Sequence, residues 1–177
     1  DGVEVAAAWA WALTETQRPS AVMLTRQKLP ALARRQDFEI AELQEGAYVL
    51  NTYGPESNET LSRHVTLVGT GSEVSLCVEV AQGLAERGVI ARVVSMPSVK
   101  LFMAGDKVRR QEILGRGLIV TVEAGITLPW GGVVGADALH IGVDTFGASA
   151  PMSDLAETYG LTKEQVLASV LKRLEER

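Results

Sequence analysis

From residue 64 onward, short β-branched runs alternate with segments of helical periodicity, and this alternation constrains the fold more than any other feature. Strands that alternate with helices are typical of α/β domains built on a mostly parallel sheet. We therefore expect an α/β fold, a three-layer domain with a mixed, mostly parallel sheet of about five strands. The strands expected in this part are 64–70, 89–96, 117–122 and 140–147, and the expected helices are 72–87, 106–115, 152–160 and 162–177.

A further strand is expected before this alternation, at 47–51 ("AYVLN"). The polar stretch 52–63 contains Gly54 and Pro55 and predicts a turn or hairpin. Strands that are joined by a turn pair easily as antiparallel neighbours. The strand at 47–51 is therefore expected at the antiparallel edge of the sheet, paired with the strand that follows the turn.

The first 45 residues lack the alternation. "DGVEVAAAWAWALTE" predicts a helix, with Asp1 as its N-cap and Glu4 three positions later, as in a capping box. "SAVMLTR" (20–26) predicts a short strand, and we interpret the charged stretch that follows it as a connector. A chain that begins on a helix cap suggests a piece of a longer protein, so residues 1–26 are expected to be a helix and a strand from another sheet.

Charge and hydropathy argue against several classes of protein. The formal net charge is −5 and no stretch is densely basic, so nucleic acid is not an expected partner. Because 46% of the residues are hydrophobic, the chain can bury a core rather than remain disordered. No apolar run reaches the ~18 residues of a membrane span, and no signal peptide is visible. We expect no membrane contact and a cytoplasmic location.

"VTLVGTGSEV" (65–74) looks at first like a dinucleotide-binding turn. Such a site needs a third glycine and an acidic residue about 20 positions later, but Val74 occupies the third position and no carboxylate ends the next strand. Glu73 would also repel a diphosphate at the start of the helix. The sequence favours a sharp turn at Gly69 and Gly71, with Ser72 capping the helix.

Few residues have the pattern of a metal or nucleophilic site. Cys77 is the single cysteine, which excludes an intrachain disulfide, and its apolar helical surroundings indicate a buried structural thiol. His64 and His140 are the two histidines, so the sequence offers no zinc spacing and no metal ligands.

Two charged residues follow β runs, where α/β proteins often place their sites. Glu123 could be catalytic, or it could hold a neighbouring backbone amide or a subunit contact, and we favour the structural role. Arg26 could hold a phosphate through its guanidinium fork, although from its chemistry alone an ordinary surface arginine is the simpler interpretation.

Segments along nearly the whole chain resemble transketolase. "VEVAAAWAWAL" is similar to the last helix of the family's pyrimidine-binding domain, and "AVMLTRQKLP" to the strand and "SRQNLP" turn that follow it. "GTGSEVSLCVEVAQGLAERGVIARVVSMPS" is similar to a block of the family's C-terminal domain. "VEAGI", "DTFGASAP" and "YGLT" resemble its closing signatures, and all these segments come in the family's order.

The resemblance implies a domain organisation. Residues 1–30 would be the tail of the pyrimidine-binding domain, 31–45 a connector, and 46–177 the C-terminal domain. The family's metal-binding Gly-Asp-Gly motif, its catalytic Glu and its active-site histidines have no counterpart in this chain. The fragment alone is therefore expected to be non-catalytic and to bind neither cofactor nor metal. Arg26 matches the family's arginine that binds the phosphate of the sugar substrate.

For the full-length enzyme, the resemblance implies transfer of a two-carbon ketol unit from a ketose phosphate to an aldose phosphate, in the pentose phosphate pathway. It also implies thiamine diphosphate, a divalent cation (Mg or Ca) and a homodimer. Two related thiamine diphosphate enzymes, deoxyxylulose-phosphate synthase and the pyruvate dehydrogenase beta subunit, remain alternatives, as does a separate, non-catalytic binding or dimerisation module. "ITLPWGGVVG" (126–135) departs from the family pattern, so local dimer or domain contacts are expected to differ there.

Overall fold

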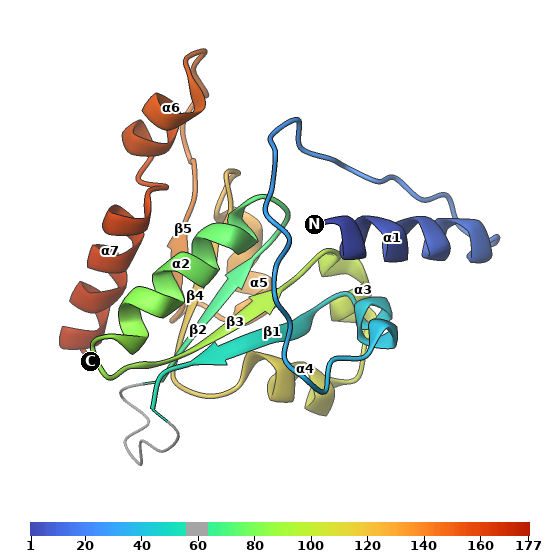
Figure 1. Ribbon diagram of the computed structural model, residues 1–177, viewed down its shortest axis with the longest axis horizontal. Coiled ribbons are helices and arrows are strands. Elements are labelled where there is room, and N and C mark those ends of the chain that lie inside the picture. The colour runs from blue at the N-terminus through green and yellow to red at the C-terminus, as the bar shows by residue number, and fades with distance from the viewer. Residues whose placement is uncertain (56–63) are drawn as a thin grey trace.

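The computed structural model describes residues 1–55 and 64–177, and its centre is a five-stranded mixed sheet with the strand order β1-β3-β2-β4-β5 (Figure 1). The strands are β1 (Tyr48–Tyr53), β2 (His64–Gly69), β3 (Ile90–Ser95), β4 (Leu118–Val122) and β5 (Leu139–Ile141). β3, β2, β4 and β5 run parallel, and β1 is antiparallel to β3. The expected α/β fold with a mostly parallel sheet is confirmed.

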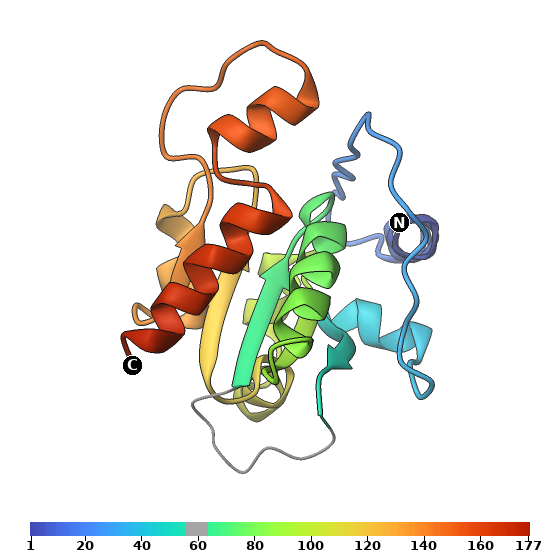
Figure 2. The same ribbon diagram turned by 60° about the vertical axis from the view of Figure 1, so that its left-hand side comes forward.

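Helices cover both faces of this sheet, as Figure 2 shows in a second view. The helices are α1 (Gly2–Thr14), α2 (Glu73–Ala85), α3 (Val99–Ala104), α4 (Lys107–Leu114), α5 (Gly131–Val134), α6 (Met152–Thr158) and α7 (Lys163–Glu175), with 3₁₀ turns η1 (Ile40–Glu45) and η3 (Leu128–Trp130). Helices α3 and α5 were not expected from the sequence, and the last strand is shorter than the predicted 140–147.

Successive strand residues point to opposite faces, so the sheet divides the core in two. One cluster contains Leu67, Val93 and Val120 of the central strands together with the inner sides of α2 and α7. The other contains Val68 and Val94 of the same strands together with apolar residues of α3, α4 and the η3–α5 turn. Strands buried on both faces explain why their sequences are nearly continuous apolar runs.

The edge position of β1 agrees with the prediction, but its neighbour does not. β1 pairs with β3, Tyr48 opposite Ser95, whereas the sequence predicted pairing with β2. The hairpin rule holds for tight loops of about two to five residues, and a longer connection can pass a neighbouring strand. The predicted turn at 52–63 lies mostly outside the described residues.

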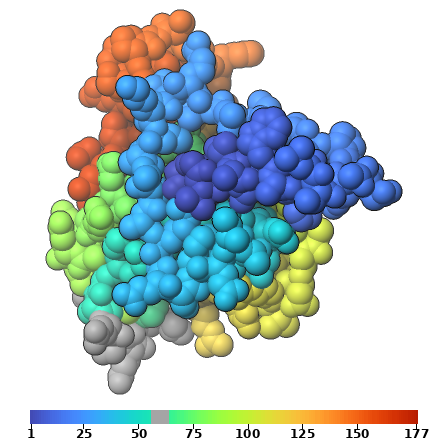
Figure 3. Space-filling view, turned by 45° about the vertical axis from the view of Figure 1, so that its right-hand side comes forward, coloured from blue at the N-terminus to red at the C-terminus, as the bar shows by residue number. Residues whose placement is uncertain are grey.

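The N-terminal segment lies along the surface of this domain. In Figure 3 the dark blue α1 crosses the molecule beside the cyan connector. The capping box of Asp1 and Glu4 is present, but α1 buries no residue, and Trp9 and Leu13 are 55% and 74% exposed. The predicted strand at 20–26 does not form, because a strand needs a partner for its backbone groups and the described residues supply none there.

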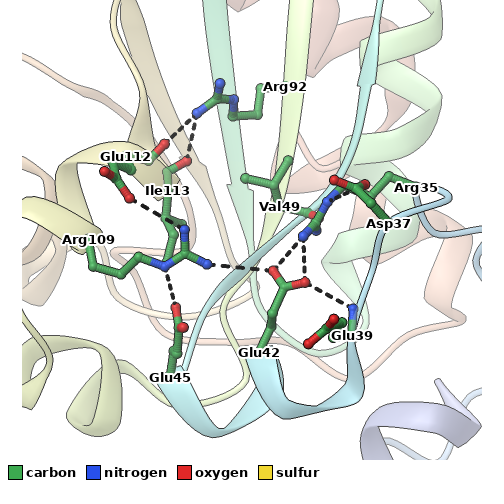
Figure 4. A network of polar contacts seen from close by, with 10 residues as sticks. All are labelled: Arg35, Asp37, Glu39, Glu42, Glu45, Val49, Arg92, Arg109, Glu112 and Ile113. Carbon is green, nitrogen blue, oxygen red and sulfur yellow. Dashed lines mark hydrogen bonds and ion pairs between the residues drawn. The ribbon is translucent and has the colours of Figure 1, made fainter.

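The connector covers the outer edge of β1. The Arg35 amide donates to the Leu50 carbonyl at 2.9 Å, and its guanidinium donates to the Val49 carbonyl, next to the register shift of this strand. Nη2 of the same guanidinium donates to both carboxylate oxygens of Glu42, at 2.5 and 2.6 Å, and Arg109 of α4 approaches Glu42 at 3.7 Å (Figure 4). This ion-pair network protects an edge strand that would otherwise expose its backbone groups.

The network predicts an acid-sensitive contribution to stability. Burial raises the pKa of Glu42, but the hydrogen bonds from Arg35 and from the Glu39 amide outweigh it, so the pKa lies below its ordinary value. A lowered carboxyl pKa stabilises the fold fully above the ordinary pKa of the group, and this stabilisation is lost as the pH falls through the lowered pKa. Glu42→Gln should therefore lower the free energy of unfolding by about 1–2 kcal/mol at pH 7 and by less at pH 3, which lies below the ordinary pKa of the group.

Urea unfolding at both pH values measures the effect of Glu42→Gln. Asp37→Asn is the matched control, because Asp37 also pairs with Arg35 at 3.0 Å but its side chain is 84% exposed. Exposed pairs contribute little, so this variant should change the stability by less than about 0.5 kcal/mol at either pH. Equal losses for Glu42→Gln at pH 7 and pH 3 would contradict the electrostatic explanation.

Candidate functional site

The glycine turn after β2 is built for close packing of helix on strand. A Cβ at Gly69 would lie 2.9 Å from the Cys77 sulfur and 3.0 Å from the Val74 Cα, and Gly71 has a positive φ of 56°. These contacts support the prediction of a sharp turn. The predicted cap is wrong, however: Ser72 already has helical φ and ψ, so its hydroxyl does not cap a backbone amide and instead donates to the Glu73 carboxylate at 2.7 Å.

Glu73 occupies the place where such folds bind ligands. From β2 the chain continues to β3 on one side, and from β4 it continues to β5 on the other, so the topological switch point lies between β2 and β4. In open α/β sheets, ligands bind beside this point at the carboxyl ends of the strands. Here the Glu73 carboxylate, 8% exposed, accepts the Ala124 amide at 3.2 Å across the gap. The chain's own carboxylate thus fills the position that an anionic ligand would take.

Glu123 makes a hydrogen bond that supports the fold, in agreement with the structural role favoured from the sequence. It follows β4, and its carboxylate accepts the buried Trp130 indole N–H at 2.8 Å. Close by, the Asp144 carboxylate accepts both the amide and the hydroxyl of Thr127, at 2.8 and 2.7 Å. These hydrogen bonds shape the loops around 126–135, where the sequence departs from the resemblance, and they give Glu123 a role in packing.

Cys77 is fully buried in α2, as expected for a structural thiol. Burial, together with the nearby Glu73 carboxylate, raises the pKa of its thiol, which opposes formation of a reactive thiolate. Among the described residues, no group of three or more His, Cys, Asp and Glu side chains is placed to hold a metal ion. In the same part of the chain, no helix is long and apolar enough to cross a membrane.

Arg26 lies on the surface, in the loop between α1 and the connector. Its side chain makes no hydrogen bond or ion pair with any residue that the structure describes. The three residues after it, 27–29, line a hollow of about 810 Å³ together with the start of α2, with α6 and with the start of α7. Figure 3 shows the blue loop beside the orange segment that carries α6. Arg26 is thus exposed at the border of this hollow and does not lie inside a preformed site.

The charges around this hollow are mixed. Lys28 and Lys163 are its cationic residues, and four glutamates, Glu73, Glu79, Glu157 and Glu164, also line it. The first turns of α2 and α7 open toward the same space, and helix N-termini favour negative charge. The hollow therefore has no single charge that would select one small ligand, and the structure brings none of the other sequence-predicted site residues to Arg26.

Sequence reasoning missed one polar cluster. The Glu4 carboxylate accepts the hydroxyls of Tyr48 and Ser95, so α1 is tied to two strands of the sheet. The predicted capping box gave Glu4 a role within its own helix. Nothing in the sequence indicated that its carboxylate would also bond to residues so far along the chain. A serine that ends an apolar strand, in "RVVSMPS", was the one available signal.

Comparison with known proteins places this fold in a family. The model of the transketolase-like TK C-terminal domain matches residues 46–162. The chromosomal transketolase of Cupriavidus necator is 44% identical over 99% of the chain and 25% of its own length, and the transketolase of Geobacillus stearothermophilus is 38% identical over 94% and 25%.

Solved structures give the same result. Transketolase from Leishmania mexicana superposes with a TM-score of 0.83 at 32% identity, over 99% of this chain and 24% of that one. Transketolase from Campylobacter jejuni gives 0.80 at 35% identity, over 97% and 25%. The chain spans about a quarter of the length of the curated relatives it matches. With these matches over nearly its whole length, the chain belongs to the transketolase family.

Proposed function

We propose that this chain is the C-terminal part of a transketolase, an enzyme that moves a two-carbon ketol unit from a ketose phosphate to an aldose phosphate. The observation that carries the proposal is the match to transketolases over 99% of the chain, at 44% identity with the Cupriavidus necator enzyme. The full-length enzyme would be a homodimer in the cytoplasm and would serve the pentose phosphate pathway.

The catalytic chemistry would be supplied by thiamine diphosphate, held with a divalent cation, Mg²⁺ or Ca²⁺, and the cofactor would act as the electron sink after C–C cleavage. The described residues of this chain do not fit either group. They form no metal-ligand cluster, and Glu73 lies where a diphosphate would meet the glycine turn. Both groups would therefore bind to parts of the full-length enzyme outside this chain.

The contribution of this chain to substrate binding would be Arg26. A guanidinium fork matches the oxygens of a phosphate, and an exposed arginine without partners among residues 1–55 and 64–177 is available for one. The match of "LTRQ" to the family's turn supports this assignment. Residues 1–30 would complete the pyrimidine-binding domain, 31–45 would connect it, and 46–177 would be the C-terminal domain.

Two measurements test the proposal. The full-length protein that contains this chain should catalyse ketol transfer between phosphorylated sugars when supplied with thiamine diphosphate and Mg²⁺. The 177-residue chain alone should not, and titration calorimetry should detect no binding of thiamine diphosphate, NAD or ATP to it. Micromolar affinity of the isolated chain for any of these ligands would overturn the division of roles.

A separate, non-catalytic module is the second candidate. A solved structure described as a split gene transketolase in an inactive beta4 tetramer superposes with a TM-score of 0.61 at 27% identity, over 85% of this chain and 48% of that one. This relative supports the idea that part of a transketolase can exist as its own polypeptide. The upstream reading frame decides between the two: a frame that encodes a Gly-Asp-Gly motif favours the single-chain enzyme.

A further inference from the structure

A single carboxylate fastens α1 to the sheet. Glu4 Oε1 accepts the Tyr48 hydroxyl at 2.9 Å and the Ser95 hydroxyl at 2.5 Å. Tyr48 begins β1 and Ser95 ends β3, and the two residues are directly opposite each other in the paired strands. Both donors are fully buried, and the Glu4 side chain is 12% exposed. A carboxylate that is largely removed from water is costly unless it is hydrogen-bonded, so these two hydroxyls fix where the start of α1 can lie.

A second contact closes the segment that follows α1. The Asp1 carboxylate accepts the Arg34 guanidinium at 2.7 and 3.0 Å and the Leu32 amide at 3.1 Å. Arg34 in turn lies over the rings of Phe38 and Tyr48, with its guanidinium carbon 5.3 and 5.8 Å from their centres. The start of α1 and the end of the Arg26 loop therefore meet at one place, against the first residue of β1.

The loop between these two anchors has little to hold it. None of the described residues from 15 to 31 is buried, and Arg26 lies near the middle of this stretch. The position of its guanidinium thus depends on the two fixed ends of the loop, in addition to the packing of residues 27–29 beside the hollow. Both ends rest on the C-terminal domain through Tyr48, Ser95 and the connector.

We propose that Glu4, held by Tyr48 and Ser95, is a positioning residue for Arg26. The C-terminal domain would then act in substrate binding without touching the substrate, by holding the phosphate-binding loop of the neighbouring domain in place. This inference rests on the proposed role of Arg26 in binding a sugar phosphate. Hydrogen bonds are directional, so a carboxylate that accepts two of them holds the helix in one position on the sheet. An apolar contact would let the helix slide along the sheet.

The sharpest test removes the two donors and leaves the capping box of α1 intact. In the full-length transketolase that contains this chain, Tyr48→Phe/Ser95→Ala should raise the KM for a phosphorylated ketose about three- to tenfold, because misplacing a binding group weakens the contacts it makes. The KM for the unphosphorylated donor hydroxypyruvate should change less than twofold. In an Arg26→Ala background the same pair of changes should have no further effect, since coupled residues are not additive.

A matched variant controls for the loss of a tyrosine and a serine hydroxyl. Tyr159→Phe/Ser169→Ala removes one hydroxyl that donates to the Phe146 carbonyl in the loop before α6 and one that donates to the Gln165 carbonyl in α7. It should leave both KM values unchanged. Glu4→Gln keeps an amide oxygen as the acceptor for the two hydroxyls, so it should retain most of the phosphorylated-donor affinity.

Two results would overturn the inference. Equal losses with both donors would mean that the cluster supports the fold, and additive losses with Arg26→Ala would mean that it acts elsewhere. If Arg26→Ala itself does not distinguish the two donors, the phosphate role fails independently, and hydrogen exchange decides the positioning role. Faster exchange of the α1 amides and of the Leu32 amide in Tyr48→Phe/Ser95→Ala would support it, and unchanged exchange would refute it.

Discussion

Replacing Arg26 by alanine in the full-length enzyme should raise the KM for phosphorylated donors and acceptors by about one to two orders of magnitude. This range corresponds to the roughly 1.5–3 kcal/mol of charge-assisted hydrogen bonds that a guanidinium fork makes with a phosphate. The phosphate is remote from the reacting carbonyl, so the loss should appear mainly in KM, with a smaller loss in kcat if positioning suffers.

Paired steady-state kinetics with a ketose phosphate and with hydroxypyruvate measure this effect, because hydroxypyruvate has no phosphate to lose. Arg18→Ala is the matched control: Arg18 belongs to the same loop but its guanidinium pairs with Glu15 at 2.7 Å. It should leave both donors unaffected. Equal losses for both donors in Arg26→Ala would show that Arg26 supports the fold or the cofactor site instead.

Arg26→Lys separates charge from geometry. A lysine ammonium is a point charge that cannot form two parallel hydrogen bonds to a phosphate. The variant should therefore recover only part of the affinity that Arg26→Ala loses. Full recovery would indicate that Arg26 attracts the substrate through its charge alone.

The central fold could be predicted because its signals are local. β2 and β3 are mostly apolar runs buried on both faces, and each is followed by a helical segment. Such βαβ units have a single common hand and place successive strands in parallel, so the direction of these strands follows from the alternation. The parallel arrangement of β2, β3 and β4 could therefore be predicted from the sequence.

The errors occurred where long-range contacts decide the structure. The neighbour of β1 depends on which edge is free once β2, β3 and β4 have assembled, and the sequence of β1 does not contain this information. The run at 20–26 has strand propensity but no partner in the described residues, and propensity alone does not make a strand. Ser72 has the right residue type for a cap, but its helical backbone prevents that role.

The candidate site was only partly predictable for the same reason. Arg26 was proposed because the sequence around it resembles a family motif, and its chemistry alone does not distinguish it from a surface arginine. The Glu4 cluster joins residues that are far apart in the sequence, and the bond from Ala124 to Glu73 does the same. Contacts of this kind depend on the assembled sheet, so a single sequence does not reveal them.

Substitution of Gly46 should strongly destabilise the domain. It ends η1 with a positive φ of 83°, and a Cβ there would meet the Phe102 amide nitrogen, lie 2.5 Å from the Ser98 carbonyl oxygen and 2.7 Å from the Leu101 Cβ. The first two are backbone atoms of the α3 turn, whose Ser98 amide bonds to the Gly46 carbonyl at 3.0 Å, so they cannot move aside without breaking that contact.

Gly46→Ala should therefore lower the free energy of unfolding by about 2–5 kcal/mol, through the strained backbone and the overpacked turn together. For a chain of this size the loss corresponds to a decrease in Tm of about 5–15 °C, measurable by thermal and urea unfolding. Gly131→Ala is the matched control, because Gly131 has helical φ and ψ with open space around its Cβ position. A helical alanine is favoured over glycine, so this variant should be neutral or stabilising by up to about 1 kcal/mol. Similar stabilities for the two variants would mean that the α3 turn can move to accommodate a Cβ at Gly46. The connector would then not be fixed to the domain at this residue.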